Sequence, residues 1–145
     1  MHVRQQIRDA VKTALTGLAT TGYDVFVGRT RALAVDHPPT LLIYAIEENS
    51  VIDAQGNPAT LMRELTVAVE GRVVAAEPPD DTLDRIALEV ETAMAAAYLA
   101  VLAHEWHLAA TKINTQSPGE SNAGEVRMEF SLQYRTTESA PGTAV

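Results

Sequence analysis

Residues 125–135 read EVRMEFSLQYR, and apolar and polar side chains alternate along the whole stretch. The apolar side chains occupy every second position: Val126, Met128, Phe130, Leu132 and Tyr134. Successive side chains of a β-strand point to opposite faces of its sheet, so this period of two predicts a strand with one buried face. The fold is therefore expected to contain a sheet that is covered on one side.

A neighbouring segment is predicted to pair with this strand. Residues 106–115 are predicted to form a second strand. The polar stretch 116–124 (QSPGESNAG) joins the two strands as a β-hairpin with a long loop. Residues 137–145 lack periodicity and are expected to form a flexible C-terminal tail.

Three further strands are predicted earlier in the chain, at residues 23–27, 40–46 and 61–74. Gly71 is predicted to mark a bulge in the last of them. The stretch 47–60 contains Gly, Asn and Pro and is predicted to be a turn-rich connection, whose first residues could extend the preceding strand.

Two helices are predicted from apolar residues that recur at steps of three and four. The first spans residues 3–18, with Gly22 as its stop signal. The second begins at an N-cap, Asp80 or Asp81, and continues to about residue 103. Its last part, 93–103, is apolar all round, and another subunit could supply its second cover.

The predicted order is therefore α-β-β-β-α-β-β. A two-layer α+β sandwich satisfies this order, with a mixed or antiparallel sheet of about five strands and two helices on one face. With 145 residues, the chain suits one domain, which we place at residues 1–136.

Charge and composition exclude several classes of function. The chain has no Cys, so disulfides, Cys-based zinc sites and thiol nucleophiles are impossible. Its net charge of −8 argues against tight binding to a phosphate backbone. The acidic second helix and the basic first helix suit side-by-side packing, within or between subunits, although two solvated faces would account for the same charges. The sequence lacks a secretory signal and an apolar run long enough for a membrane span.

The most enzyme-like string is His104-Glu105-Trp106-His107. Its histidines are three apart, whereas the metalloprotease motif needs a spacing of four on a helix. Two histidines without a third ligand make a weak zinc site, so we expect a structural junction with Trp106 packed in the core. Phosphate-binding glycine loops and nucleophile elbows do not occur either. The prediction is that the chain has no catalytic residue, cofactor or metal.

Several sequence stretches resemble one family. These are VRQQIRDAV at 3–11, TALTGLATTG at 13–22, VFVGR at 25–29 and PPTLLIY at 38–44. The chain resembles the tail terminator proteins of tailed phages, the group similar to the minor tail protein U of lambdoid phages. The sequence similarity extends over about the first third of the chain. For the remainder, the resemblance rests on the order and size of the predicted elements.

The resemblance implies a structural virion protein with an α/β sandwich fold. Such a protein forms a homohexameric ring at the head-proximal end of a long tail, assembled in the host cytoplasm. It stops polymerisation of the tail tube and provides the docking surface for the head–tail connector. Its partners are other copies of itself, the tail tube protein and the connector or neck protein; DNA passes through the lumen without specific binding, and no membrane is involved.

Loops at the ends of a sheet are where stacked rings touch, so contact residues are expected there. The predicted interaction residues are Arg29, Arg31, Glu47, Glu48, Asp53, Ser117 and Glu120. Two alternative functions remain open. One is another head–tail joining, neck or tail-completion protein, and the more distant one is a small oligomeric α+β enzyme that binds a metal or ligand through His104, Glu105 and His107.

Overall fold

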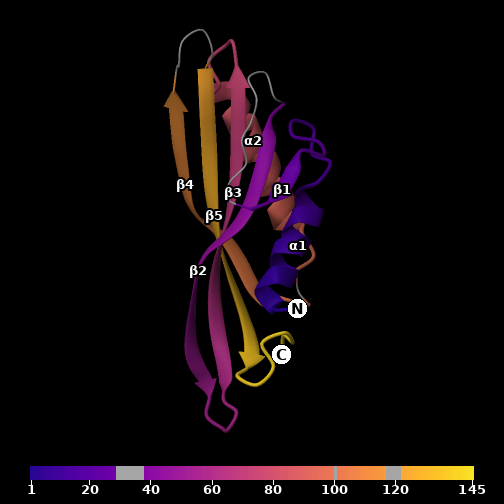
Figure 1. The fold of residues 1–145 in the computed structure, drawn as a ribbon, viewed down its shortest axis with the longest axis vertical. Helices are drawn as coiled ribbons and strands as arrows, with labels where there is room; N and C mark the ends of the chain where they lie inside the picture. Colours follow the sequence, from indigo (N-terminus) through magenta and orange to yellow (C-terminus); the bar gives the residue numbers. More distant parts are fainter. Residues whose placement is uncertain (29–37, 100, 117–121) are drawn as a thin grey trace.

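The computed structural model describes residues 1–28, 38–99, 101–116 and 122–145. Within these residues, two helices cover one face of a five-stranded mixed sheet (Figure 1). The elements in chain order are α1 (Val3–Leu15), β1 (Val25–Val27), β2 (Thr40–Ala54), β3 (Thr60–Ala75), α2 (Asp80–Ala96), β4 (Glu105–Gln116) and β5 (Asn122–Thr137). The α+β class and the order α-β-β-β-α-β-β are thus confirmed.

The strands lie in the order β1-β2-β3-β5-β4. β1 is parallel to β2 and pairs with only three of its residues, Leu41–Ile43. The other neighbours are antiparallel, and β3 pairs along its whole length with β5. This arrangement leaves the outer side of β4 and most of the outer side of β2 as edges of the sheet within the described residues.

The core lies between the helices and the sheet. Each helix buries one stripe at steps of three and four, and alternate residues of β3 and β5 face that stripe. The buried residues of this layer include Ile7, Val11, Leu15, Leu83, Ile86, Val90, Val67, Val69, Met128, Phe130, Leu132 and Tyr134. The alternation of residues 125–135 therefore has the predicted cause, because its apolar side chains face the helices.

Gly71 does not form the predicted bulge. It pairs regularly with Leu41 on one side and Val126 on the other. A Cβ atom at Gly71 would lie 2.8 Å from Ile86 Cγ2, so the glycine is there to let α2 approach the sheet. The irregularities in register lie in β2 instead, between Ala45 and Glu47 and between Ile52 and Ala54.

The first helix ends earlier than predicted. α1 stops at Leu15, and Thr16 already has an extended conformation. Gly17 adopts a φ of +91° directly after it, a value that favours glycine, so Gly17 rather than Gly22 follows the helix end. Gly22 forms a bridge with Leu18 and its carbonyl accepts the Gly17 N–H at 2.8 Å.

The second helix differs from its prediction at both ends. Pro79 is its N-cap, and neither aspartate caps it; Asp80 and Asp81 lie in the first turn, where carboxylates stabilise the helix dipole. The helix ends at Ala96 rather than near residue 103. The chain leaves the helix there and buries Leu99 in the same core.

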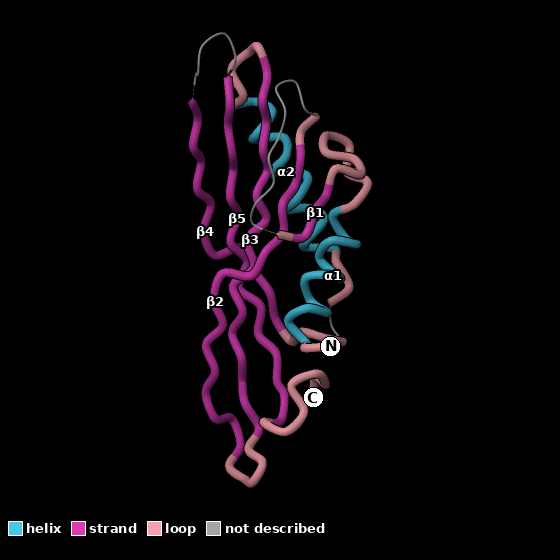
Figure 2. The backbone as a smooth tube through the Cα atoms, in the orientation of Figure 1, coloured by secondary structure: helices cyan, strands magenta, loops and turns pink. Residues whose placement is uncertain are grey.

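The first part of the segment 47–60 extends the preceding strand, as the sequence allows, and the turn is shorter than predicted. β2 continues to Ala54, β3 begins at Thr60, and only residues 55–59 form the turn. The resulting hairpin projects well beyond the two helices (Figure 2). Val51 and Ile52 are β-branched and pair with Met62 and Leu61, which accounts for the longer strand. We call residues 46–62 the distal hairpin.

The C-terminal tail, expected to be flexible, is held by hydrogen bonds. The Val3 N–H donates to the carbonyl of Pro141 at 3.0 Å, and the Gln6 side chain donates to the carbonyl of Gly142 at 2.9 Å. The Val145 N–H donates to the carbonyl of Arg135 at 3.0 Å. The first of these bonds satisfies a backbone N–H at the start of α1, a partner that the local sequence of the tail does not reveal. None of the helices in the described part of the chain has the length and apolar character needed to cross a bilayer.

Candidate interaction surfaces

The predicted interaction residues separate into two groups. Arg29, Arg31, Ser117 and Glu120 lie outside the described residues. Glu47, Glu48 and Asp53 lie on β2, in or beside the distal hairpin, and the structure does not bring them together. Glu47 is exposed, Glu48 is turned inward, and Asp53 Oδ2 accepts from Arg135 Nε at 2.8 Å.

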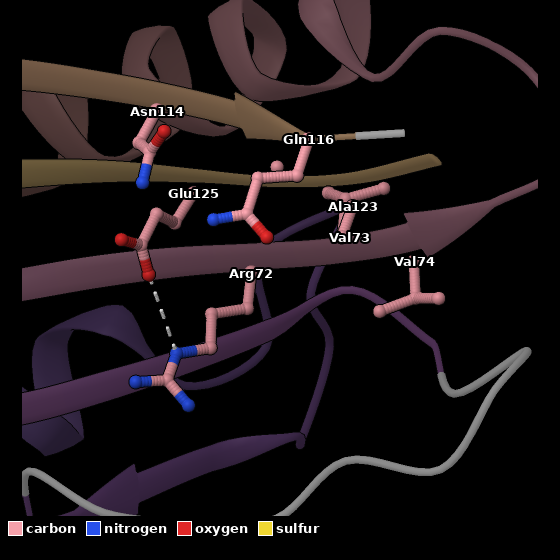
Figure 3. Close-up of a pocket in the computed structure, with 8 residues that line it drawn as sticks. Arg72, Val73, Val74, Asn114, Gln116, Ala123 and Glu125 are labelled. Atoms are coloured by element: carbon pink, nitrogen blue, oxygen red, sulfur yellow. Dashed lines mark ion pairs between the residues drawn. The ribbon is translucent and has the colours of Figure 1, made fainter. Parts of the chain in front are cut away.

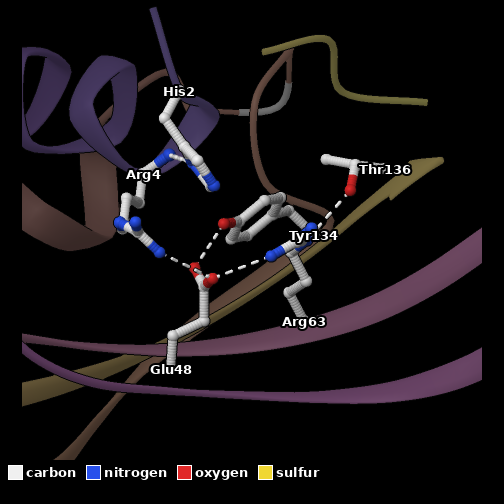
Figure 4. A network of polar contacts seen from close by, with 6 residues as sticks. All are labelled: His2, Arg4, Glu48, Arg63, Tyr134 and Thr136. Atoms are coloured by element: carbon white, nitrogen blue, oxygen red, sulfur yellow. Dashed lines mark hydrogen bonds and ion pairs between the residues drawn. The ribbon is translucent and has the colours of Figure 1, made fainter. Parts of the chain in front are cut away.

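Glu48 is the centre of a polar cluster between α1 and the sheet (Figure 4). Its Oε1 accepts from Arg4 Nη1 at 3.1 Å and from Arg63 Nη1 at 3.0 Å. Its Oε2 accepts from the hydroxyl of Tyr134. Arg63 Nε donates in turn to Thr136 Oγ1 at 2.9 Å. We call these residues (Arg4, Glu48, Arg63, Tyr134 and Thr136) the Glu48 cluster.

Apart from Arg4, whose side chain is 46% exposed, the Glu48 cluster is only slightly accessible to water. The side chain of Glu48 is 10% exposed and that of Arg63 is 12% exposed. Burial raises the pKa of Tyr134, and its hydrogen bond to Glu48 raises it further. Burial also lowers the pKa of His2, helped by the charge of nearby Arg4. His2 Nδ1 accepts from the Arg4 N–H at 3.2 Å, which caps α1.

The cluster joins three parts of the chain that are distant in sequence. Arg4 belongs to α1, Glu48 to β2, and Tyr134 to β5. These contacts connect the base of the distal hairpin to the helical layer, and they turn the carboxylate of Glu48 toward α1 and β5 rather than toward solvent. One signal for it is present in the sequence, because Arg63 interrupts the apolar row of β3 between Leu61 and Leu65.

The opposite face of the sheet carries no helix among the described residues, and we call it the helix-free face. Near Leu42, Tyr44 and Ala68 it holds a small apolar cluster. The rest is lined by paired charges: Arg72 Nη2 lies 2.9 Å from Glu70 Oε2, and Lys112 Nζ lies 3.2 Å from Glu129 Oε1. A hollow of about 330 Å³ lies beside Arg72 and Glu125, whose ion-pair distance is 3.9 Å (Figure 3).

This pairing of charges decides what the helix-free face can bind. Besides Arg72 and Lys112, this face carries Arg127, whose Nη2 lies 3.4 Å from Glu129 Oε1. A guanidinium or ammonium group that already has a carboxylate partner gains less from a phosphate, because the carboxylate competes for the same donors. The face is therefore poorly suited to holding a nucleic-acid backbone.

Glu70 is the buried acid of this face, with 6% of the residue exposed. Burial raises its pKa, and the charge of Arg72 offsets this only in part. A carboxyl group with a raised pKa in the folded state keeps its proton to higher pH than it does in the unfolded chain. Its contribution to stability is therefore lost as the pH rises from the ordinary value of about 4.5 through the raised one.

We expect Glu70→Gln to flatten the pH dependence of stability above about pH 4.5. Glutamine cannot ionise, so the variant should gain on the wild type as the pH rises from 4 to 7. Urea unfolding at several pH values, followed by circular dichroism, measures this difference. Glu47→Gln, on the same face but exposed and remote from the groups that shift the pKa of Glu70, is the matched control. A constant difference between wild type and Glu70→Gln across this range would contradict the prediction.

The segment 104–107 lies at the junction between the end of α2 and the start of β4. Trp106 packs against the core as predicted, and its Nε1 donates to the carbonyl of Met94 at 3.0 Å. His104 Nε2 lies 3.1 Å from the carbonyl oxygen of Val145. In the described part of the chain, no group of three or more His, Asp or Glu side chains is placed to hold a metal ion.

A hollow of about 590 Å³ runs between α2 and β4 beside Trp106. Met94, Leu108 and Phe130 supply its apolar lining, and His104, Glu105, His107 and Glu91 lie at its polar rim. β4 has no covering helix further along, so Ile113 is 58% exposed although it lies on the side of the sheet that the helices cover. The helix side of β4 therefore has two exposed apolar positions, Leu108 beside the hollow and Ile113 beyond it.

Two further apolar surfaces are exposed. On the distal hairpin, Val51 is 63% and Ile52 55% exposed. After α2, Tyr98 and Val101 are exposed, while Leu99 and Ala103 are buried in the chain's own core. The stretch predicted to be covered by another subunit is thus only partly available, because Met94, Leu99 and Ala103 are buried in the core of the same chain.

No model of a protein family matches this chain. No curated protein matches it either. Among solved structures, it is similar to a chain of the "Virion of native gene transfer agent (GTA) particle", with a TM-score of 0.40 and 13% identity over 91% of this chain and 92% of that chain.

Proposed function

We propose that this chain is a structural virion protein, the tail terminator of a long-tailed phage or phage-like particle. In this role it forms a ring at the head-proximal end of the tail, stops polymerisation of the tail tube and offers the surface on which the head connector docks. The resemblance of residues 3–44 to that family motivates the proposal. The observation that carries it is an open sheet with two different exposed edges, β4 and the outer side of β2.

A ring made of one kind of subunit needs two different contact surfaces on each copy. Contacts of this head-to-tail kind generate a closed ring when the rotation between neighbours closes, whereas a self-complementary surface stops at a dimer. The two edges lie at opposite ends of the strand order β1-β2-β3-β5-β4. They therefore supply the pair of unlike surfaces that a ring requires.

The distal hairpin supports the second part of the role. A terminator must also contact a different ring, stacked above or below its own. The turn at residues 55–59 lies at the end of the molecule farthest from α2 (Figure 1). A projecting turn of this kind is positioned to meet an adjoining ring, and the Glu48 cluster holds its base in place.

The electrostatics suit a channel that conducts DNA. The chain carries a net charge of −8, and the cations of the helix-free face lie beside carboxylates. A lumen with few free cations does not retain a phosphate backbone as the DNA passes. Contacts to the tube protein, to the connector and between copies of this chain are the partners that this role requires.

Electron microscopy of particles produced without this gene tests the proposal. We expect tails that are overlong, variable in length and not joined to filled heads, and complementation from a plasmid should restore normal particles. Tails of normal, uniform length that fail to join heads would instead indicate a neck or head–tail joining protein. Intact, infectious particles would refute a structural role in tail assembly.

A further inference from the structure

We infer that the edge of β4 in one copy of this chain pairs with the outer edge of β2, residues 46–54, in its neighbour. This contact joins the two sheets into one, and it rests on the proposed function only in treating the assembly as a ring. Both edges belong to the same chain and lie at opposite ends of its sheet. Repeating the contact adds one copy at a time in a fixed direction.

The backbone provides the first argument. Within the described residues, β4 pairs only with β5, and residues 46–54 pair only with β3. An unpaired edge presents a row of N–H and C=O groups that template another strand. The two edges are also comparable in length, with twelve residues in β4 and nine in the stretch 46–54. Each can therefore satisfy the other's backbone groups along most of its length.

The side chains provide the second argument. Ile113 and Leu108 of β4 lie on the helix side of the sheet and are uncovered there. Ile52 lies on the same side, because it pairs with Leu61 in the row that faces the helices, and it is also exposed. A strand added to β4 would place alternate side chains next to the hollow at Trp106, which is how strand addition combines backbone bonds with side-chain pockets.

Charge decides between this contact and its self-paired alternatives. The stretch 46–54 (IEENSVIDA) carries three acidic residues and no basic one. Glu48 and Asp53 are paired with arginines of the same chain, so exposed Glu47 supplies most of the repulsion between two such edges. β4 carries one acid, Glu105, and one base, Lys112, whose side chain is 59% exposed. An acidic strand therefore meets an edge whose own two charges cancel, and whose Lys112 already lies 3.2 Å from Glu129. The charges favour β2 against β4 over β2 against β2.

Crosslinking tests the contact cleanly because the chain contains no cysteine. Two single-cysteine variants, Ile52→Cys and Ile113→Cys, are mixed and treated with a short bismaleimide. We expect at least about tenfold more covalent dimer from the mixture than from either variant alone, as a head-to-tail contact requires. Leu88→Cys, on the exposed side of α2, replaces Ile52→Cys in the control mixture and should give no enrichment.

Each other outcome would overturn the inference. Dimers from Ile113→Cys alone would indicate β4 against β4, and dimers from Ile52→Cys alone would indicate paired hairpins. No enrichment in the mixture would show that these edges do not meet. Far-ultraviolet circular dichroism of each variant first establishes that it is folded.

A second experiment uses lysine in place of cysteine. Ile52→Lys and Ile113→Lys each damage one edge and leave the other intact. Mixed together, they should form a one-to-one dimer that cannot grow, detected by native mass spectrometry, while each alone stays monomeric. A mixture that stays monomeric, or single variants that assemble like the wild type, would contradict the inference.

The inference and the proposed function can fail separately. Enriched crosslinking together with normal tails after loss of the gene would keep the contact and remove the terminator role. Overlong tails together with no crosslinking would keep the role and remove this contact.

Discussion

Glu48→Ala is expected to lower the free energy of unfolding by about 3 kcal/mol, because it removes the only carboxylate of a nearly buried cluster. Arg63, 12% exposed, would lose the partner that its Nη1 contacts at 3.0 Å. Tyr134, which is fully buried, would lose the acceptor of its hydroxyl. The loss exceeds that of a surface ion pair because a buried cation and a buried hydroxyl are left without compensation.

Glu47→Ala provides a matched control at the adjacent position. Glu47 is exposed, and the contact of its Oε1 is with Asn49 Nδ2 at a long 3.4 Å. We expect this variant to change the free energy of unfolding by about 0.5 kcal/mol or less, as is usual for surface positions. Urea unfolding of both variants, followed by circular dichroism, makes the comparison.

The reach of the cluster can be measured locally as well. If it fixes the base of the distal hairpin, Glu48→Ala should also speed amide hydrogen exchange in residues 46–62 more than in β5 near Met128. Equal stability of Glu48→Ala and Glu47→Ala, or an unchanged exchange pattern in the hairpin, would show that Glu48 does not have this role.

Gly124→Ala should destabilise the protein by about 2 kcal/mol through overpacking between α2 and the sheet. A Cβ atom at Gly124 would lie 2.7 Å from Pro79 Cγ and 2.9 Å from Leu83 Cδ1. The ring of Pro79 cannot turn away, so the start of α2 must shift. At Gly71 the close atoms, Ile86 Cγ2 at 2.8 Å and Val126 Cγ1 at 3.1 Å, belong to buried β-branched side chains with stiff rotamers, so Gly71→Ala should cost a similar amount, about 2 kcal/mol.

A double-mutant cycle separates steric overlap from other effects of alanine. Pro79→Ala removes the nearest atom, so the pair Gly124→Ala and Pro79→Ala should be more stable than the sum of the two single changes predicts. Thermal unfolding of the four proteins gives the interaction energy. Additive losses would mean that contact with Pro79 is not the cause.

The alternation at residues 125–135 and the helical periodicity of residues 3–15 were sufficient to predict the α+β class and the element order. Both patterns are local, because a strand or helix with one buried face records that face in its own residues. The same reasoning placed Trp106 correctly against the core. It could not find the ends of the helices, since Gly17 and Gly22 are equally plausible stops in a sequence and the backbone of the folded chain selects between them.

The candidate surfaces were much harder to predict, and Glu48 shows why. Glu47 and Glu48 are identical in type and adjacent in sequence, and both were expected to be contact residues. The register of β2 against β3 turns Glu48 toward Arg63 and leaves Glu47 exposed. Arg4 and Tyr134 reach the same carboxylate from opposite ends of the chain. No local pattern contains a meeting of this kind.

Local sequence patterns thus establish the set of helices and strands and the face that each one buries. The extent of β2 and the open edges of the sheet are seen only in the tertiary structure. The same holds for the close packing that requires glycine at positions 71 and 124. These features depend on distances between segments that are remote in the chain. They arise because strands gain their hydrogen bonds from other strands, whereas the periodicity of a segment records only whether each side chain is covered.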